Sequence, residues 1–184
     1  HLLYNIIDSA MRLYTTIWSI PTAHKKNLDS DITLYSGQGS RKKILINDLD
    51  ETSVNENWTL PTFISSTINR DVALRFGGSN DGRTIIEIKI PKDKVKIFKY
   101  TEVDWETDME HPATREVSLQ EKEILLAPYT VFKFKGKESK LFDFRVPHGN
   151  GTVSSHSDTT KVYFLEFVSF EYPTPDVFYE KGVK

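Results

Sequence analysis

The residues best suited to chemistry in this chain are Glu121 and Glu123, two glutamates separated by one position. Apolar residues follow them, so residues 121–126 are predicted to form a β-strand, on which side chains two positions apart share a face. Two like charges beside each other lower stability unless a function uses them, although an exposed edge strand would tolerate the pair. A carboxylate fixed in such a place can stabilise positive charge that develops on a substrate.

Two other segments place small polar residues at the ends of predicted strands. Ser65, Ser66 and Thr67 carry three consecutive hydroxyl groups, which can orient a carboxylate and a ribose through side-chain hydrogen bonds. Ser36 and Gly37 follow an apolar strand, and a glycine lets a planar ligand approach the backbone because it has no Cβ. Taken alone, each of these patterns is more typical of an ordinary strand end than of a binding site.

The absent residue types and motifs exclude several classes of site. The chain has no cysteine, which rules out a disulfide framework, a thiolate nucleophile, a Cys-ligated zinc and an iron–sulfur cluster. Its five histidines form no H-x-x-x-H pair, and we expect no metal cofactor. Neither a glycine-rich phosphate-binding motif nor a G-x-S-x-G nucleophile motif occurs.

Composition and charge narrow the class of protein further. Apolar residues make up 38% of the 184 residues, enough for a buried core and for one domain. The 24 basic and 26 acidic residues leave a formal charge of −2, which gives no reason to expect a nucleic-acid partner or a basic membrane-binding surface. No apolar run approaches the roughly 18 residues of a membrane span.

The elements that must position these residues indicate a single α+β domain over residues 1–184. Residues 1–21 are predicted to form an N-terminal helix, because apolar side chains recur at three- and four-residue steps. Asn69 is expected to cap a short helix through Phe76, and residues 147–160 to form a flexible loop. The other apolar runs predict strands at residues 32–35, 62–67, 84–90, 94–100, 121–126, 131–135 and 162–172.

In their order and spacing, the three polar segments resemble the mono-ADP-ribosyltransferase family, specifically its Arg–Ser–Glu class. Ser36 precedes Ser65 by 29 residues, and Ser65 precedes Glu123 by 58. The family's Phe-x-Ser-Thr-Ser strand is similar to the segment from Phe63 to Thr67, and its Glu-x-Glu motif to the segment that begins at Glu121. The resemblance covers roughly residues 30–135 and extends to the final strand.

The resemblance implies an ADP-ribosyltransferase-like fold, in which an N-terminal helix and two packed, mainly antiparallel sheets form a cleft for the substrate NAD. It implies that Glu123 fixes the ribose, that Ser65 orients Glu123, and that Glu121 directs transfer to an arginine of a target protein. A toxin or effector of this kind would be secreted or delivered into another cell. The residues that would hold NAD are Ser36, Gly37, Ser66, Thr67, Arg75 and Phe76.

One position departs from the family pattern, because Ser36 stands where the family has an arginine that helps to hold the NAD phosphates. Arginine offers a permanently charged fork, whereas serine offers one hydroxyl. Another cation replaces it, NAD binds weakly, or the position has been altered. Three functions stay open: an arginine-directed transferase, an NAD glycohydrolase on the same fold, and a catalytically silent binding module. The candidate replacement cations are Arg41, Arg70, Arg75 and Arg83.

Overall fold

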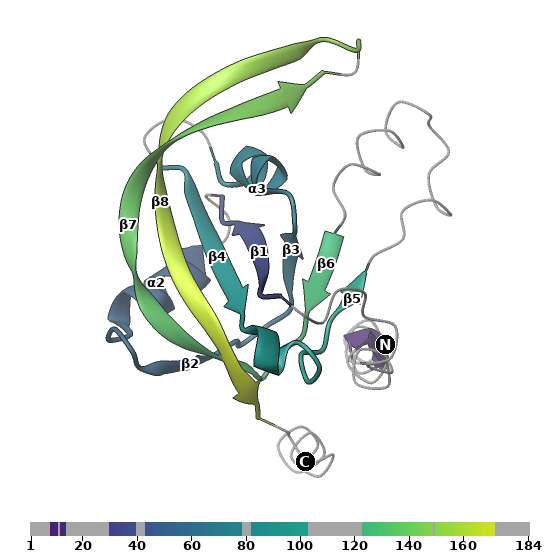
Figure 1. Cartoon of the computed structure of the whole chain (residues 1–184), viewed down its shortest axis with the longest axis vertical. Coiled ribbons are helices and arrows are strands. Elements are labelled where there is room, and N and C mark those ends of the chain that lie inside the picture. Colours follow the sequence, from purple (N-terminus) through teal and green to yellow (C-terminus); the bar gives the residue numbers. More distant parts are fainter. Residues whose placement is uncertain are drawn as a thin grey trace.

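A curled β-sheet, with helices against both of its faces, forms the body of the molecule (Figure 1). The structure, a computed structural model, describes residues 8–10, 12–13, 30–39, 43–78, 82–102, 123–148 and 150–171. Within these residues, eight strands are hydrogen-bonded in the order β2-β7-β8-β4-β1-β3-β6-β5. The strands are β1 (Ile32–Gly37), β2 (Asn57–Thr59), β3 (Ile64–Thr67), β4 (Thr84–Ile90), β5 (Thr101–Glu102), β6 (Glu123–Leu126), β7 (Thr130–Pro147) and β8 (Val153–Phe170).

The sheet is antiparallel except where β4 pairs with β8. Side chains alternate between its two faces, and the face that we call the α2 face carries the larger core. Helix α2 (Lys43–Glu51) packs there through Leu45 and Leu49. The other face, the α3 face, receives Ala73 and Leu74 of helix α3 (Arg70–Phe76). The α2 face buries a nearly continuous apolar layer that includes Leu34, Ile86, Ile88, Phe134, Tyr163 and Leu165.

The long hairpin of β7 and β8 is the most extended part of the fold, with 18 residues in each strand (Figure 1). Its lower half belongs to the sheet, and its upper half continues past β4 and over α3. Helix α2 is tied to this hairpin by Asp50, whose carboxylate accepts a hydrogen bond from Tyr163 at 2.7 Å and pairs with the Lys137 ammonium. These contacts join helix α2 to both strands of the hairpin.

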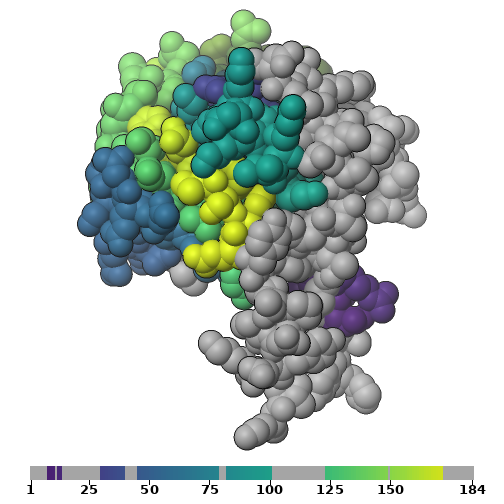
Figure 2. All heavy atoms as spheres, turned by 60° about the horizontal axis from the view of Figure 1, so that its bottom comes forward, coloured from purple at the N-terminus to yellow at the C-terminus, as the bar shows by residue number. Residues whose placement is uncertain are grey.

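At the opposite end, the last residues of β8 are covered by the segment that follows β4. The 3₁₀ turn η3 (Lys92–Lys94) leads to Phe98, whose ring centroid lies 4.8 Å from that of Phe167 and 6.3 Å from that of Phe170. Figure 2 shows this end of β8 between the α2–β2 region and the β4–η3 region. Within the described residues, no helix is long and apolar enough to cross a membrane.

Most of the predicted elements are present, and the α+β class is confirmed. Asn69 caps α3 as expected, because its side-chain oxygen accepts a hydrogen bond from the Asp71 N–H at 3.1 Å. Residues 8–10 and 12–13 are helical, and the rest of the expected N-terminal helix lies outside the described residues. The strands expected in two packed sheets are hydrogen-bonded into one continuous order.

Two expectations about secondary structure are wrong, and one helix is present that the sequence did not predict. Residues 94–100 form no strand, because Val95 and Phe98 are buried three residues apart on a turn while Ile97 between them is 52% exposed. The loop expected over residues 147–160 is shorter, because β8 already begins at Val153 and pairs with β7 along its length. Helix α2 was not expected from the sequence.

Candidate active site

Glu123 begins β6, and the strand register places it directly opposite Thr67, the last residue of β3. Thr67 lies in turn opposite Tyr35 of β1. Directly opposed residues of an antiparallel pair project from the same face, with Cβ atoms roughly 4.5–5.5 Å apart. Tyr35, Thr67 and Glu123 therefore form a row across three strands of the α3 face. Thr67 is buried and Glu123 is half-buried, so the carboxylate is partly shielded from water.

Ser65 shares this face with Glu123 but is not its direct partner. The register pairs Ser65 with Leu125, which makes Ser65 a diagonal neighbour of Glu123. Diagonal neighbours lie roughly 7–8 Å apart between Cα atoms, against about 5 Å for direct ones. The structure thus brings the expected residues Ser65, Thr67 and Glu123 together, with Thr67 in the closest strand position to the carboxylate.

Ser36 and Ser66 point to the α2 face, where both are almost completely buried, with exposed fractions of 1% and 3%. The Ser36 hydroxyl donates to the backbone carbonyl of Ser65 at 2.6 Å, and the Ser66 hydroxyl donates to the carbonyl of Ile124 at 2.7 Å. Each serine thereby links its own strand to the next one. The hydrogen bond of Ser36 links β1 to β3, two strands whose register is set by the pair Tyr35–Thr67.

Gln38, which the sequence did not indicate as a site residue, contacts Ser36. It lies two residues further along the chain and is 3% exposed. Its side-chain Nε2 donates to the Ser36 hydroxyl at 2.8 Å, while its Oε1 is buried without a hydrogen-bond partner among the described residues. The hydroxyl of Ser36 is therefore surrounded by neutral partners, the Gln38 amide and the Ser65 carbonyl. The two-residue strand period could have indicated that these side chains share a face.

Gly37 is in close contact with the last turn of α3. A Cβ at this position would lie 2.4 Å from the Ala73 carbonyl oxygen and 2.7 Å from backbone carbon and Cβ of Phe76. Glycine is required here because the helix, rather than an added side chain, fills this space. The strand end that is expected to hold a ligand through its backbone thus packs directly against the turn that carries Phe76.

Phe76 and Arg75 lie at the end of α3, beside this strand end. The Phe76 side chain is 56% exposed, which is unusual for an aromatic ring and suits contact with a planar group. Arg75 is half-buried, and its Nε atom is buried without a hydrogen-bond partner within the described part of the chain. A buried donor without a partner is costly unless something binds it.

The other candidate arginines have different surroundings. Arg70, at the start of α3, is exposed and lies 4.9 Å from the centroid of the Phe142 ring. Arg83 is committed to contacts within the protein, since it pairs with Asp158 at 3.1 Å and its side chain is only 10% exposed. Arg41 lies outside the described residues.

Charged groups also surround Tyr35 in the cross-strand row. Burial raises the pKa of the Tyr35 hydroxyl, the carboxylate of Glu87 on β4 raises it further, and the Arg70 guanidinium opposes them. The α3 face therefore presents a neutral phenol beside Thr67, with a carboxylate and a guanidinium nearby. Among the described side chains, no group of three or more His, Cys, Asp or Glu could hold a metal ion.

Glu121 and the loop before it, residues 103–122, lie outside the described residues. The expected pairing of Glu121 with Glu123 on one face therefore remains a prediction.

Comparison with solved structures identifies the class of fold. The enzymatic component C2-I of the C2-toxin from Clostridium botulinum superposes with a TM-score of 0.53 at 11% identity, over 92% of this chain and 37% of that one. Its S361R form gives a TM-score of 0.50 at 10% identity over the same shares. C3larvin, an ADP-ribosyltransferase from Paenibacillus larvae, gives 0.47 at 14% identity over 89% of this chain and 77% of its own.

The superposition on C2-I shows that the chain has the ADP-ribosyltransferase-like fold that the sequence led us to expect. The chain spans 37% of the length of C2-I. No protein-family model and no curated protein sequence matches the chain.

Proposed function

We propose that this chain is an NAD-dependent mono-ADP-ribosyltransferase that transfers ADP-ribose to an arginine side chain of a target protein. The observation that carries the proposal is the place of Glu123 within this fold. Its carboxylate lies directly across from Thr67 and on the same face as Ser65. The neighbouring strand end, Gly37, is packed against the turn that presents an exposed Phe76.

In the proposed reaction, the bond between the nicotinamide nitrogen and the ribose C1′ breaks, and nicotinamide leaves with the bonding electrons. The ribose becomes oxocarbenium-like, and the half-buried carboxylate of Glu123 stabilises that positive charge more strongly than it would in water. A guanidinium nitrogen of the target then bonds to C1′ and loses a proton to the surrounding water. Glu121, two residues earlier, accepts hydrogen bonds from the guanidinium and favours its attack.

NAD would be held by the strand end and by the last turn of α3. The backbone of Ser36 and Gly37 binds the nicotinamide amide, and the exposed ring of Phe76 packs against the nicotinamide. Ser65 and Thr67 orient Glu123 and the ribose. Ser36 and Ser66 contribute by fixing the strands, since both hydroxyls donate to backbone carbonyls of the neighbouring strand.

The negative diphosphate requires a cation that Ser36 cannot supply, and we assign that role to Arg75. Its Nε has no hydrogen-bond partner within the described residues, and it immediately precedes Phe76 on α3. Arg83 is unsuited because its guanidinium already binds Asp158 and the Leu74 carbonyl. Replacing Arg75 with Gln should therefore weaken NAD binding on the order of tenfold, the contribution of one charge-assisted hydrogen bond.

The deciding experiment incubates the protein with labelled NAD and agmatine, a small arginine analogue, and separates the products. An ADP-ribosyl–agmatine adduct supports the proposal, release of free ADP-ribose alone identifies a glycohydrolase, and unchanged NAD identifies a catalytically silent module. Glu121→Gln should abolish the adduct while sparing much of the hydrolysis. Glu138→Gln, which removes an exposed carboxylate paired with Lys140 on the hairpin, is the matched control and should change neither product.

A further inference from the structure

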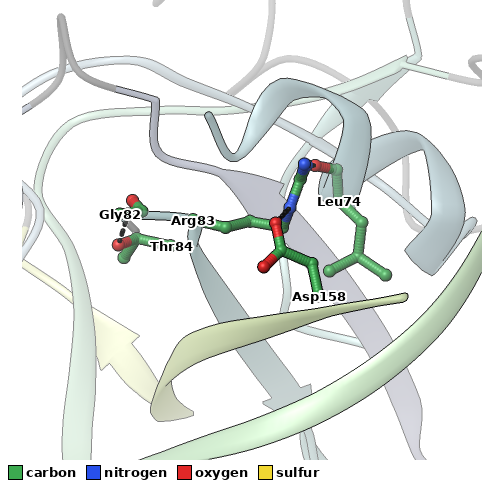
Figure 3. A network of polar contacts seen from close by, with 5 residues as sticks. All are labelled: Leu74, Gly82, Arg83, Thr84 and Asp158. Atoms are coloured by element: carbon green, nitrogen blue, oxygen red, sulfur yellow. Dashed lines mark hydrogen bonds and ion pairs between the residues drawn. The ribbon is translucent and has the colours of Figure 1, made fainter. Parts of the chain in front are cut away.

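Arg83, the residue before β4, contacts α3 and both strands of the β7–β8 hairpin, and Figure 3 shows its contacts with Leu74 and Asp158. Its guanidinium Nη1 donates to the Leu74 carbonyl in the last turn of α3. Its Nε donates to the Asp158 carboxylate on β8 at 3.1 Å, and the guanidinium carbon lies 4.6 Å from the centroid of the Phe144 ring on β7. One side chain thus connects β4 and α3 to both strands of the hairpin.

The geometry makes this contact a strong one. The Arg83 side chain is 10% exposed and that of Asp158 28%, so their ion pair is less screened by water than a surface pair. The cation lies at the C-terminal end of a helix, where it interacts favourably with the partial negative charge of the last carbonyls. Its backbone is fixed as well, because the Arg83 carbonyl accepts a hydrogen bond from the Lys161 N–H at 2.9 Å.

The turn that Arg83 holds is the one that carries the proposed nicotinamide contact. The Leu74 carbonyl also accepts a hydrogen bond from the Gly77 N–H at 3.2 Å, and the Gly77 carbonyl accepts one from the Thr84 N–H at 2.8 Å. Phe76 lies between Leu74 and Gly77 within this closed set of contacts. The backbone of Phe76 also packs closely against Gly37, so a displaced turn would move both the aromatic ring and the strand end.

We infer that Arg83 is a positioning residue for the NAD site: with Asp158 it fixes the last turn of α3, and thereby places Phe76 and Gly37 for the nicotinamide. The inference rests on the proposed function for its substrate. The upper half of the β7–β8 hairpin thus stabilises the position of α3 beside the site. Two further contacts join the hairpin to α3, from the Arg145 N–H to the Asp71 carboxylate at 3.3 Å and from Arg70 to the Phe142 ring.

The first test measures how strongly the backbone amides of the turn are protected from exchange, and it does not depend on activity. Hydrogen exchange of the Gly77 and Thr84 amides is compared in the wild type, Arg83→Gln and Lys89→Gln. Lys89 is the matched control because it lies on the same strand and forms an exposed ion pair with Asp31 at 2.9 Å, near the other end of β4. We expect at least tenfold faster exchange of these two amides in Arg83→Gln alone. An equal acceleration of all core amides, or none at these two, would overturn the inference.

The second test measures NAD turnover, as KM and kcat, in the same variants. Because Phe76 contacts bound substrate before reaction as well as during it, Arg83→Gln should raise KM about tenfold and leave kcat within twofold. Arg83→Lys, which keeps the cation, should recover part of the loss and covers the case in which Arg83→Gln folds poorly. In a Phe76→Ala background the effect of Arg83→Gln on KM should be smaller, since the part of the effect that acts through the Phe76 ring is lost.

The outcomes separate the two ideas. A wild-type protein that leaves NAD unchanged defeats the proposed function, and the exchange measurement still decides whether Arg83 fixes the turn. A wild type that turns over NAD, with an unaltered KM in Arg83→Gln or the same KM change with and without Phe76, defeats the positioning role while the proposed function stands.

Discussion

Replacing Gly37 with alanine provides the sharpest structural test of how the site is built. The added Cβ would lie 2.4 Å from the Ala73 carbonyl oxygen, about 1 Å inside the 3.4 Å at which ordinary van der Waals contact begins. Both neighbours it meets belong to the backbone or Cβ of α3, so no flexible side chain can move aside. The last turn of α3 must therefore shift by about 1 Å, or β1 must shift away from it.

The size of the effect follows from that displacement. Overpacking of this kind lowers the free energy of unfolding by roughly 1–3 kcal/mol. A misplacement of about 1 Å at groups that position substrate can lower the rate about 100-fold. We therefore expect Gly37→Ala to remain folded, to unfold at lower urea concentration, and to lose about 100-fold in kcat/KM for NAD hydrolysis.

Gly82→Ala is the control for this prediction. A Cβ added to Gly82 meets no described atom within 4 Å, and its backbone needs no positive φ. It should leave turnover unchanged and should leave stability unchanged or slightly higher, because alanine restricts the unfolded chain. The reasoning would be refuted by a Gly37→Ala protein with wild-type stability and wild-type kcat/KM.

Three further predictions concern single side chains. Glu123→Gln should lower both transfer and hydrolysis by on the order of 10²–10³-fold while unfolding stays near normal, and wild-type turnover would remove Glu123 from the mechanism. Ser36→Arg should lower the unfolding free energy by about 2–4 kcal/mol, because it breaks one buried and one part-buried hydrogen bond and crowds a site that is 1% exposed. An equally stable variant that binds NAD more tightly by calorimetry would contradict this. Asp50→Asn should unfold at lower urea concentration near pH 7, and the difference should shrink below pH 3.8, because the Lys137 ammonium lowers the pKa of Asp50 and that stabilisation is lost as the carboxylate is protonated; a pH-independent difference would rule out this cause.

Local sequence signals determined several parts of the molecule correctly. The side-chain oxygen of Asn69, followed by an amphipathic turn, was sufficient to place the start of α3, because an N-cap satisfies backbone donors within its own segment. The apolar run over residues 84–90 likewise became β4, whose buried residues line both faces of the sheet. The motif spacing also indicated the class of fold that the structural comparison shows.

Tertiary packing decided the elements that the sequence misassigned. Residues 94–97 alternate between lysine and apolar side chains, which is typical of a strand, yet the chain turns so that Val95 and Phe98 are both buried in the core. Burial of these side chains requires an apolar partner surface, which for Phe98 includes Phe167 and Phe170. No local signal specifies that surface, because it comes from the end of β8.

The candidate site divides in the same way. The sequence by itself determined that Ser65 and Thr67 share one face of their strand. It likewise determined that Ser36 and Gln38 share one face of theirs, because side chains alternate along any strand. Only the tertiary structure decided that Thr67, and not Ser65, lies opposite Glu123, and that Ser36 is buried and hydrogen-bonded to Gln38. Register and the choice of buried face depend on contacts between strands far apart in the sequence, and the periodicity of one strand carries no information about which residue of another will lie across from it.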